Sequence, residues 1–555
     1  MEETIKLAPL FGFHICCAFA LVSLSWIFIH RWRQMNIKSP KTWPFIASTI
    51  EQLINYERMH DWLTEYLAKS KTVTVKLPFK SYTYIADPVN VEHVLKTNFR
   101  NYPKGEVYRS YMDVLLGDGI FNADGELWRN QRKTASFQFA SKNLRDFSTH
   151  VFREYALKLS RILARRASTG SAIDLQDLFL RMTLDSICEV GFGVEVGTLA
   201  PDLPENRFAQ AFDAANAVVM LRFVDPFWRI KRLLGVGSEA LLAESIKAVD
   251  EFTYGIIRKR KAEIEQRRDQ VYNQSINDPD WSVDMIDCMV TGTHQVKHDI
   301  LSRFIELGDE GGGDKSLRDV VLNFVIAGRD TTAATMSWFV YMMVNHPRVA
   351  EKLCGELKEF EQDLAEKANV PLIRYENKDV EAFAERIAQF AGLLSYESLA
   401  RLNYLHACIS ETLRLYPAVA QDLKGALEDD VLPDGTKVKA GEMVTYVPYA
   451  MGRMEYNWGP DAALFDPERW FKDGLLQTFS PFKFTAFQAG PRICLGKDSA
   501  YLQMKMTLAI LCRFFTFNLV PNHQVRYKMM TTLSMAHGLK VYVGIKCQLI
   551  DDQLQ

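Results

Sequence analysis

One cysteine of the chain, Cys494, lies in a segment whose other residues suit it to bind a metal ion. Gly490 and Gly496 on either side of it permit a tight backbone and the close approach of a flat cofactor. Arg492 offers a fork of N–H donors to a carboxylate. The apolar spacing after this segment predicts a helix that begins at Cys494, so that backbone N–H groups favour the thiolate. Taken alone, a cysteine is most often a small buried apolar residue. The residues around Cys494 favour a thiolate that binds a cofactor over a buried core cysteine between two glycines.

The cysteine count, the net charge, and the spacing of histidines and glycines argue against several other classes of function. The chain has nine cysteines, an odd number, with no C-x-x-C pair, which indicates neither a disulfide framework nor a zinc finger and fits a reducing compartment. Lys and Arg total 66 against 68 Asp and Glu, so there is no global positive field for nucleic-acid binding. The histidines lack metal-ligand spacing, and the glycine pairs complete no dinucleotide fingerprint. We therefore expect no nucleic-acid partner and no NADPH or flavin site of the chain's own.

A second chemical pattern is an acid followed by an alcohol, Asp330 and Thr331, just after Gly328 in an apolar stretch. An acid and a hydroxyl in sequence can relay protons, whereas a glycine inside a helix costs about 1 kcal/mol relative to alanine. The alternative is that Thr331 only donates back to its own helix. Both interpretations are open at the level of this pattern alone.

Two further pairs of residues have helical spacing. Glu411 and Arg414 are three residues apart, within ion-pair reach, although most such pairs are ordinary surface salt bridges. Trp128 and Arg132 are four residues apart, and both are donors suited to carboxylates. Basic residues beside this second pair could alternatively form a face for a protein partner.

The elements that must position these residues are mainly helical. An apolar stretch over residues 317–345 predicts a long central helix, with a capping box at Ser316 and Asp319 and Pro347 beyond its end. A charged stretch over 246–268 also has helical spacing, and alternation over 72–87 predicts a hairpin. Residues 273–298 are predicted to form a surface loop. We therefore expect a mainly α fold with small β-sheets.

The N-terminus predicts a single transmembrane helix. Residues 7–29 contain no Asp, Glu, Lys or Arg, and the acidic start and the length of the run favour an uncleaved anchor over a signal peptide. Lys and Arg gather just after the run, which places the rest of the chain in the cytosol. We expect a membrane anchor over 1–30, a hinge and the start of the catalytic domain over 31–70, and the catalytic domain over 71–555.

The segment from Phe487 to Gly496 resembles the cysteine-ligand loop of cytochromes P450, F-x-x-G-x-R-x-C-x-G, at every fixed position. The resemblance implies haem b with Cys494 as the axial ligand to iron, and Phe487, Gly490, Arg492 and Gly496 around the cofactor. It also implies an anchored enzyme of the endoplasmic reticulum that takes O2 and receives electrons from NADPH–cytochrome P450 reductase. The thiolate ligand favours cleavage of the O–O bond.

The same resemblance gives roles to the other patterns. Asp330 and Thr331 would deliver protons, and Trp128 and Arg132 would bind the haem propionates. A further set would form the structural triad of the family: Glu411, Arg414 and Arg469.

Longer runs, over 423–435, 453–460 and 482–487, resemble plant long-chain fatty-acid ω-hydroxylases, in particular those that make sporopollenin precursors for the pollen wall. Departures from that pattern are Ala420, Leu423 and the loop over 273–295. The family positions predicted to line the substrate channel are Phe324, Ala327, Val419 and Met535. The alternatives are a P450 with another lipophilic substrate, a haem-thiolate enzyme that rearranges hydroperoxides, and a non-catalytic haem protein. Asp330 and Thr331 favour a monooxygenase over the last two.

Overall fold

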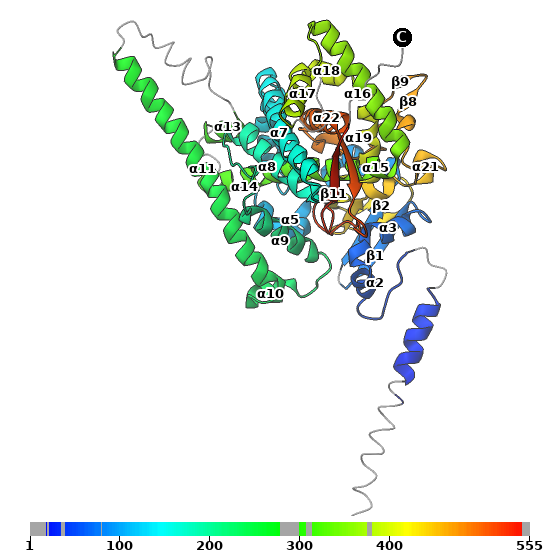
Figure 1. Ribbon diagram of the computed structural model, residues 1–555. Helices are drawn as coiled ribbons and strands as arrows, with labels where there is room; N and C mark the ends of the chain where they lie inside the picture. Colours follow the sequence, from blue (N-terminus) through cyan, green and yellow to red (C-terminus); the bar gives the residue numbers. More distant parts are fainter. Residues whose placement is uncertain are drawn as a thin grey trace, which may run out of the picture.

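The computed structural model describes residues 18, 21–34, 39–78, 80–277, 299–306, 313–373 and 380–546. Helices make up most of these residues, and the strands form small sheets that pack against them (Figure 1). The predicted fold class, mainly α with small β-sheets, is confirmed. One hydrophobic core runs from Met59 to Val543.

The helices differ widely in length, and the long ones form the body of the molecule. α7 packs against α8, α17 and α22, and α15 packs against α8 and α19. The helical bounds are α2 Thr49–Ile54, α3 Met59–Leu67, α4 Pro88–Glu92, α5 Gly105–Leu116, α6 Gly125–Phe139, α7 Lys142–Thr169, α8 Leu175–Phe192, α9 Arg207–Leu221, α10 Trp228–Leu234, α11 Ser238–Asn277, α13 Ile300–Glu306, α14 Gly313–Val325, α15 Thr331–Asn345, α16 Pro347–Ala368, α17 Val380–Leu393, α18 Tyr396–Ala400, α19 Asn403–Leu415, α20 Pro448–Met451, α21 Glu455–Trp458 and α22 Lys497–Phe514. Short 3-10 turns are η1 Tyr56–Arg58, η3 Phe99–Asn101, η6 Pro467–Trp470 and η7 Gly490–Arg492, and π-helical turns are η2 His93–Thr97 and η5 Ile326–Asp330.

The largest sheet has the strand order β1-β2-β7-β4. The predicted hairpin is confirmed, since β1 and β2 pair antiparallel with Thr72 opposite Ile85. β7 pairs parallel to β2 and antiparallel to β4, which leaves β4 at one edge. A second sheet has the order β10-β11-β3. The strand bounds are β1 Thr72–Leu77, β2 Lys80–Ile85, β3 Ile173–Asp174, β4 Asp422–Gly425, β5 Asp430–Val431, β6 Lys437–Val438, β7 Met443–Tyr446, β8 Phe471–Lys472, β9 Leu475–Leu476, β10 Phe515–Leu519 and β11 Lys540–Ile545.

The predicted long central helix is present but begins earlier and is not a regular α-helix throughout. α14 begins at Gly313, so Ser316 and Asp319 lie inside the helix and the predicted capping box is wrong. Asp319 instead accepts a hydrogen bond from the backbone N–H of Asp118, 2.9 Å away. Between α14 and α15 the chain forms the π-helical turn η5. Such turns are rare and are frequent at functional sites.

The charged stretch over 246–268 lies in α11, as predicted. That helix continues to Asn277, so the expected surface loop is wrong for its first residues, and its remainder lies outside the described residues.

Most of the predicted membrane anchor lies outside the described residues. Residues 21–32 are helical, and this blue helix projects from the body in Figure 1. Its apolar side chains are largely accessible, including Leu21, Phe28 and Trp32. Within the described ranges, no helix has both the length and the apolar character that crossing a bilayer requires.

Candidate active site

A cavity of about 480 Å³ lies between the cysteine loop and the central helix. Its volume falls in the range of small-molecule sites. It gathers most of the residues predicted from the sequence, although these come from distant parts of the chain. The predicted residues that line it are Trp128, Arg132, Phe324, Ala327, Thr331, Val419, Phe487, Arg492, Cys494 and Gly496.

The cysteine loop is closed by a backbone hydrogen bond from the N–H of Cys494 to the carbonyl of Phe487, at 2.9 Å. Cys494 has accessible surface. That surface faces the cavity, since Cys494 is one of the residues that line it. A sulfur so placed can contact a cofactor while the protein shields it from bulk water.

Gly490 has the tight backbone that was predicted, but its close contact is with another part of the chain. Its φ is +67°, a left-handed conformation that favours glycine. A Cβ on Gly490 would come within 2.0 Å of the carbonyl oxygen of Leu95. The close approach is therefore to the backbone of η2, whereas Gly496, where a Cβ would meet the Phe139 ring at 3.6 Å, faces the cavity.

The loop by itself does not favour the thiolate. α22 begins at Lys497, three residues after Cys494, so the predicted helix start is wrong. Burial raises the pKa of the Cys494 thiol, and the N–H of Gly496 and the charge of Arg132 oppose this without cancelling it. Deprotonation would therefore come with metal coordination, since a ligating cysteine binds as the thiolate.

Donors for carboxylates surround the same cavity. The guanidinium of Arg132 donates to the carbonyl of Ile493 at 2.8 Å. Arg492 lies over the ring of Trp128, 4.5 Å from its centroid, and donates to Asp124 at 2.5 Å and to Ala123 O at 2.9 Å. Asp124 was not predicted; its position directly before α6 was the only sequence signal for it.

This set of donors fits a haem. Cys494 offers sulfur to iron, and Trp128, Arg132 and Arg492 offer N–H groups to propionates. The Nε of Arg492 is buried and has no hydrogen-bond partner within the part of the chain that the structure describes. Buried donors in proteins are normally paired, so this atom indicates a ligand with an acceptor.

Comparison with known proteins agrees with this geometry. Residues 37–543 match the model of the cytochrome P450 family. The chain belongs to the cytochrome P450 family. It is 64% identical to cytochrome P450 704B1 of Arabidopsis thaliana over 96% of this chain and 99% of that protein. It is 46% identical to cytochrome P450 704C1 of Pinus taeda, over 95% and 96%, and 39% identical to cytochrome P450 86B1 of Arabidopsis thaliana, over 92% and 87%.

Membership implies a haem-thiolate monooxygenase that uses O2 and an electron-donating reductase. In this P450, Cys494 would hold the iron, and Trp128, Arg132 and Arg492 would hold the propionates. The bound haem would supply the activation of oxygen.

Asp330, the acid predicted to deliver protons, is held in a buried ion pair. Asp330 lies 2.7 Å from Arg329, which also pairs with Asp213 of α9 at 3.0 Å. Burial raises the pKa of Asp330 to about 7, although Arg329 opposes the shift. Asp330 can therefore exchange a proton near neutral pH. The contact between Arg329 and α9 was not predicted, because Asp213 is distant in the sequence.

The contacts of Thr331 and Gly328 differ from those expected of a proton relay. The hydroxyl of Thr331 donates to its own helix at Ala327 O, 2.7 Å away, which is the alternative interpretation of this residue. A Cβ on Gly328 would lie 2.6 Å from the Ile187 side chain, so this glycine also permits the close packing of α8. Thr331 is nevertheless among the residues that line the cavity.

We expect Asp330→Asn to lower the rate of product formation on the order of 100-fold, the usual contribution of a proton-transfer group, while NADPH consumption continues. In the unsubstituted enzyme, product per NADPH should fall as the pH rises through about 7, because Asp330 loses its proton there. The ratio of product to NADPH consumed, measured from about pH 6 to about pH 8, tests the effect of the substitution and the pH dependence.

Because folding raises the pKa of Asp330, the contribution of Asp330 to the unfolding free energy decreases as the pH rises from about 4 to about 7.

Asp314→Asn is the matched control, since this exposed residue of α14 pairs with Lys261 at the surface. It should leave both the ratio and its pH profile unchanged. An Asp330→Asn enzyme with an unaltered ratio would contradict the assigned role.

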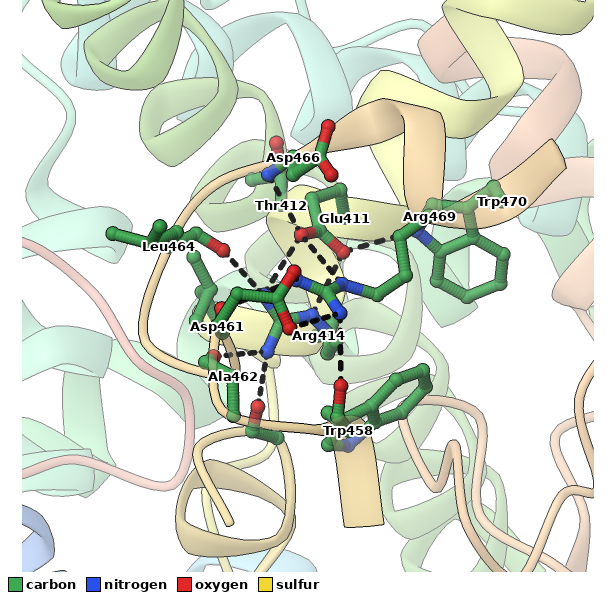
Figure 2. Close-up of polar contacts among 12 residues, drawn as sticks. Glu411, Thr412, Arg414, Trp458, Asp461, Ala462, Leu464, Asp466, Arg469 and Trp470 are labelled. Carbon is green, nitrogen blue, oxygen red and sulfur yellow. Dashed lines mark hydrogen bonds and ion pairs between the residues drawn. The ribbon is translucent and has the colours of Figure 1, made fainter. Parts of the chain in front are cut away.

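The predicted structural triad assembles as expected from α19 and η6 (Figure 2). Both oxygens of Glu411 accept from Arg414 at 2.7 Å, and Arg469 lies 3.4 Å from the same carboxylate. The N–H of Asp466 and the indole of Trp470 also donate to Glu411, at 2.9 and 3.0 Å. The triad thus fixes the segment that precedes the cysteine loop. Its three side chains are not among the residues that line the cavity, although Leu413 of the same helix is.

One predicted channel residue is placed differently. Phe324, Ala327 and Val419 line the cavity, but Met535 is not among its lining residues. The backbone of Met535 pairs with the amide of Gln176 through two hydrogen bonds, of 2.7 and 3.0 Å, and its side chain is buried. Met535 therefore belongs to the packing of its segment against α8.

Proposed function

We propose that this P450 hydroxylates long-chain fatty acids at the terminal carbon, which supplies precursors of sporopollenin or another lipid polymer. The observation that carries the proposal is the cavity, which joins Cys494 to the apolar residues Phe324, Ala327 and Val419. The sequence runs that resemble plant ω-hydroxylases support the same substrate class.

Terminal hydroxylation places a demand on positioning. A terminal methyl has stronger C–H bonds than the neighbouring methylenes, so the site must present the methyl and hold the rest of the chain away. Apolar side chains beside the cysteine can do this by contact alone. A polar side chain at these positions would find no hydrogen-bond partner on an alkyl chain.

The function is tested with microsomes that contain this P450, its reductase and NADPH. Saturated fatty acids of graded length are supplied singly, and products are identified by mass spectrometry. The proposal requires a terminal alcohol as the main product of at least one chain length. Products only from another lipophilic class, or conversion of hydroperoxides without NADPH, would replace it.

We expect Val419→Phe to move hydroxylation away from the terminal carbon or to shorten the accepted chains, because the larger ring occupies the apolar part of the cavity. The product distribution over the same fatty acids measures this. Val431→Phe, at an exposed position of β5, is the control and should leave products unchanged. An unchanged distribution in Val419→Phe would remove this residue from the channel.

We further propose that the chain is anchored in the endoplasmic reticulum membrane with its catalytic domain in the cytosol. The accessible apolar side chains of the helix over 21–32 support a lipid environment. The basic residues Arg31 and Arg33 follow the apolar run, as the positive-inside rule requires. Retention in the membrane fraction after carbonate extraction, and its loss on deletion of residues 1–30, tests the anchor.

A further inference from the structure

A chain of three aromatic rings connects α19 to the cysteine loop. The ring of His406, on α19, stacks on the ring of Tyr501, on α22, with centroids 4.4 Å apart and an angle of 15° between the planes. The ring of Tyr501 in turn packs against the ring of Phe487, with centroids 5.3 Å apart. The hydroxyl of Tyr501 also shares a hydrogen bond of 2.8 Å with the hydroxyl of Ser410, on α19. Two contacts with one helix therefore fix the ring that packs against Phe487.

Phe487 is the residue through which these rings reach the cysteine loop. It lines the cavity, and its carbonyl accepts the hydrogen bond from the N–H of Cys494 that closes the loop. The next residue, Gln488, has a φ of +62°, a left-handed conformation that is unfavourable for a residue with a side chain. Such a conformation persists only where the surrounding structure holds it. The loop therefore needs a fixed neighbour, and the ring of Tyr501 supplies one.

The outermost ring of this chain is uncharged at neutral pH. Burial, together with the positive charges of Lys505 and Lys497, lowers the pKa of His406 to about 3. A neutral imidazole needs no counter-ion, so it can lie flat on Tyr501. The contact between His406 and Tyr501 is therefore aromatic packing that does not change with pH near neutrality.

We propose that Tyr501 and His406 are positioning residues for the iron ligand. Tyr501, held by α19, keeps Phe487 in place, and Phe487 keeps the backbone acceptor of Cys494 in place. A fixed loop holds constant the hydrogen bonds of the sulfur and its exposure to water, which influence how strongly the sulfur donates electrons to iron. The alternative is that the three rings only pack α19 against α22. Packing alone would contribute to the unfolding free energy but not to the reduction potential.

The test replaces Tyr501 with leucine in the full-length, haem-loaded enzyme without substrate. We expect the thiolate-type carbon monoxide complex to convert about fivefold faster to the form that has lost the thiolate, the effect of removing one aromatic contact. The reduction potential should become more positive, because a looser loop admits water to the sulfur and weakens its electron donation. Tyr501→Phe keeps the ring and should retain both the conversion rate and the potential.

His406→Leu is a second variant, one ring further from the loop, and carries the test if Tyr501→Leu yields no folded protein. It should change the conversion rate and the potential in the same direction and by less. Tyr404→Leu is the matched control, since Tyr404 also lies on α19 but stacks on Phe471, with centroids 6.3 Å apart. It should leave both properties unchanged.

An unaltered conversion rate and potential in Tyr501→Leu, whatever its unfolding midpoint, would overturn the proposal and leave the rings a packing role only. Equal shifts in Tyr404→Leu would also overturn it, because they would show a general effect of loosening α19. The inference rests on the family's haem and is independent of the proposed substrate.

Discussion

Replacing Cys494 with alanine is expected to abolish monooxygenase activity completely and to remove the thiolate-type spectrum of the reduced carbon monoxide complex. Cys494 is the cysteine that faces the cavity, and its loop is held in place by the hydrogen bond to Phe487. The thiolate donates electron density to iron and so favours O–O cleavage. A methyl group at this position offers no ligand. Activity is measured as product per enzyme, and the spectrum on the same sample.

Cys354→Ala is the control for this experiment. Cys354 lies on α16, is partly buried and is not among the residues that line the cavity. Its replacement should leave both the spectrum and the activity intact. Survival of the thiolate-type spectrum in Cys494→Ala would refute the assignment of the iron ligand.

Replacing Glu411 with alanine is expected to destabilise the protein by about 3–5 kcal/mol, the usual cost of breaking a buried ion pair. Glu411 and Arg414 have no accessible side-chain surface. Loss of the carboxylate leaves the guanidinium of Arg414 without its anionic partner, beside the carbonyl oxygens of Gly452, Ala462 and Leu464. It also removes the acceptor of Trp470. The yield of haem-loaded protein and its thermal unfolding midpoint measure the effect.

The matched control is Lys367→Ala, which breaks the exposed pair of Lys367 with Asp363 on α16. Exposed pairs contribute little to stability, so the unfolding midpoint should be unchanged. If Glu411→Ala unfolded at the same temperature as the control, the triad would have no role as scaffold.

The sequence predicted those parts of the site in which the chemistry is local. The cysteine loop is ten residues long, and the pairs Glu411 with Arg414 and Trp128 with Arg132 each lie within one turn of a helix. Helical spacing alone brings such residues together. The hairpin of β1 and β2 is equally local, and the alternation of apolar and polar residues over 72–87 was sufficient to predict it.

What the sequence did not reveal depends on contacts between distant segments. Nothing near Gly490 indicates that Leu95 will lie against it, and nothing near Arg329 indicates Asp213. The histidine at position 406 is ordinary in the sequence of α19 and becomes unusual only when the fold stacks it on Tyr501. Helix ends were also poorly predicted, since α14 begins at Gly313 and not at the capping pattern of Ser316.

The π-helical turn at Ile326–Asp330 has a consequence for how this helix could have evolved. One residue inserted into an α-helix turns everything after it by about 100°. A π-helical turn absorbs such an insertion locally, so both flanks keep their faces. Phe324 before the turn and Trp338 after it can therefore stay packed while the residues between them change. The turn therefore allows the residues from Ile326 to Asp330 to change without altering the packing of the helices before and after it.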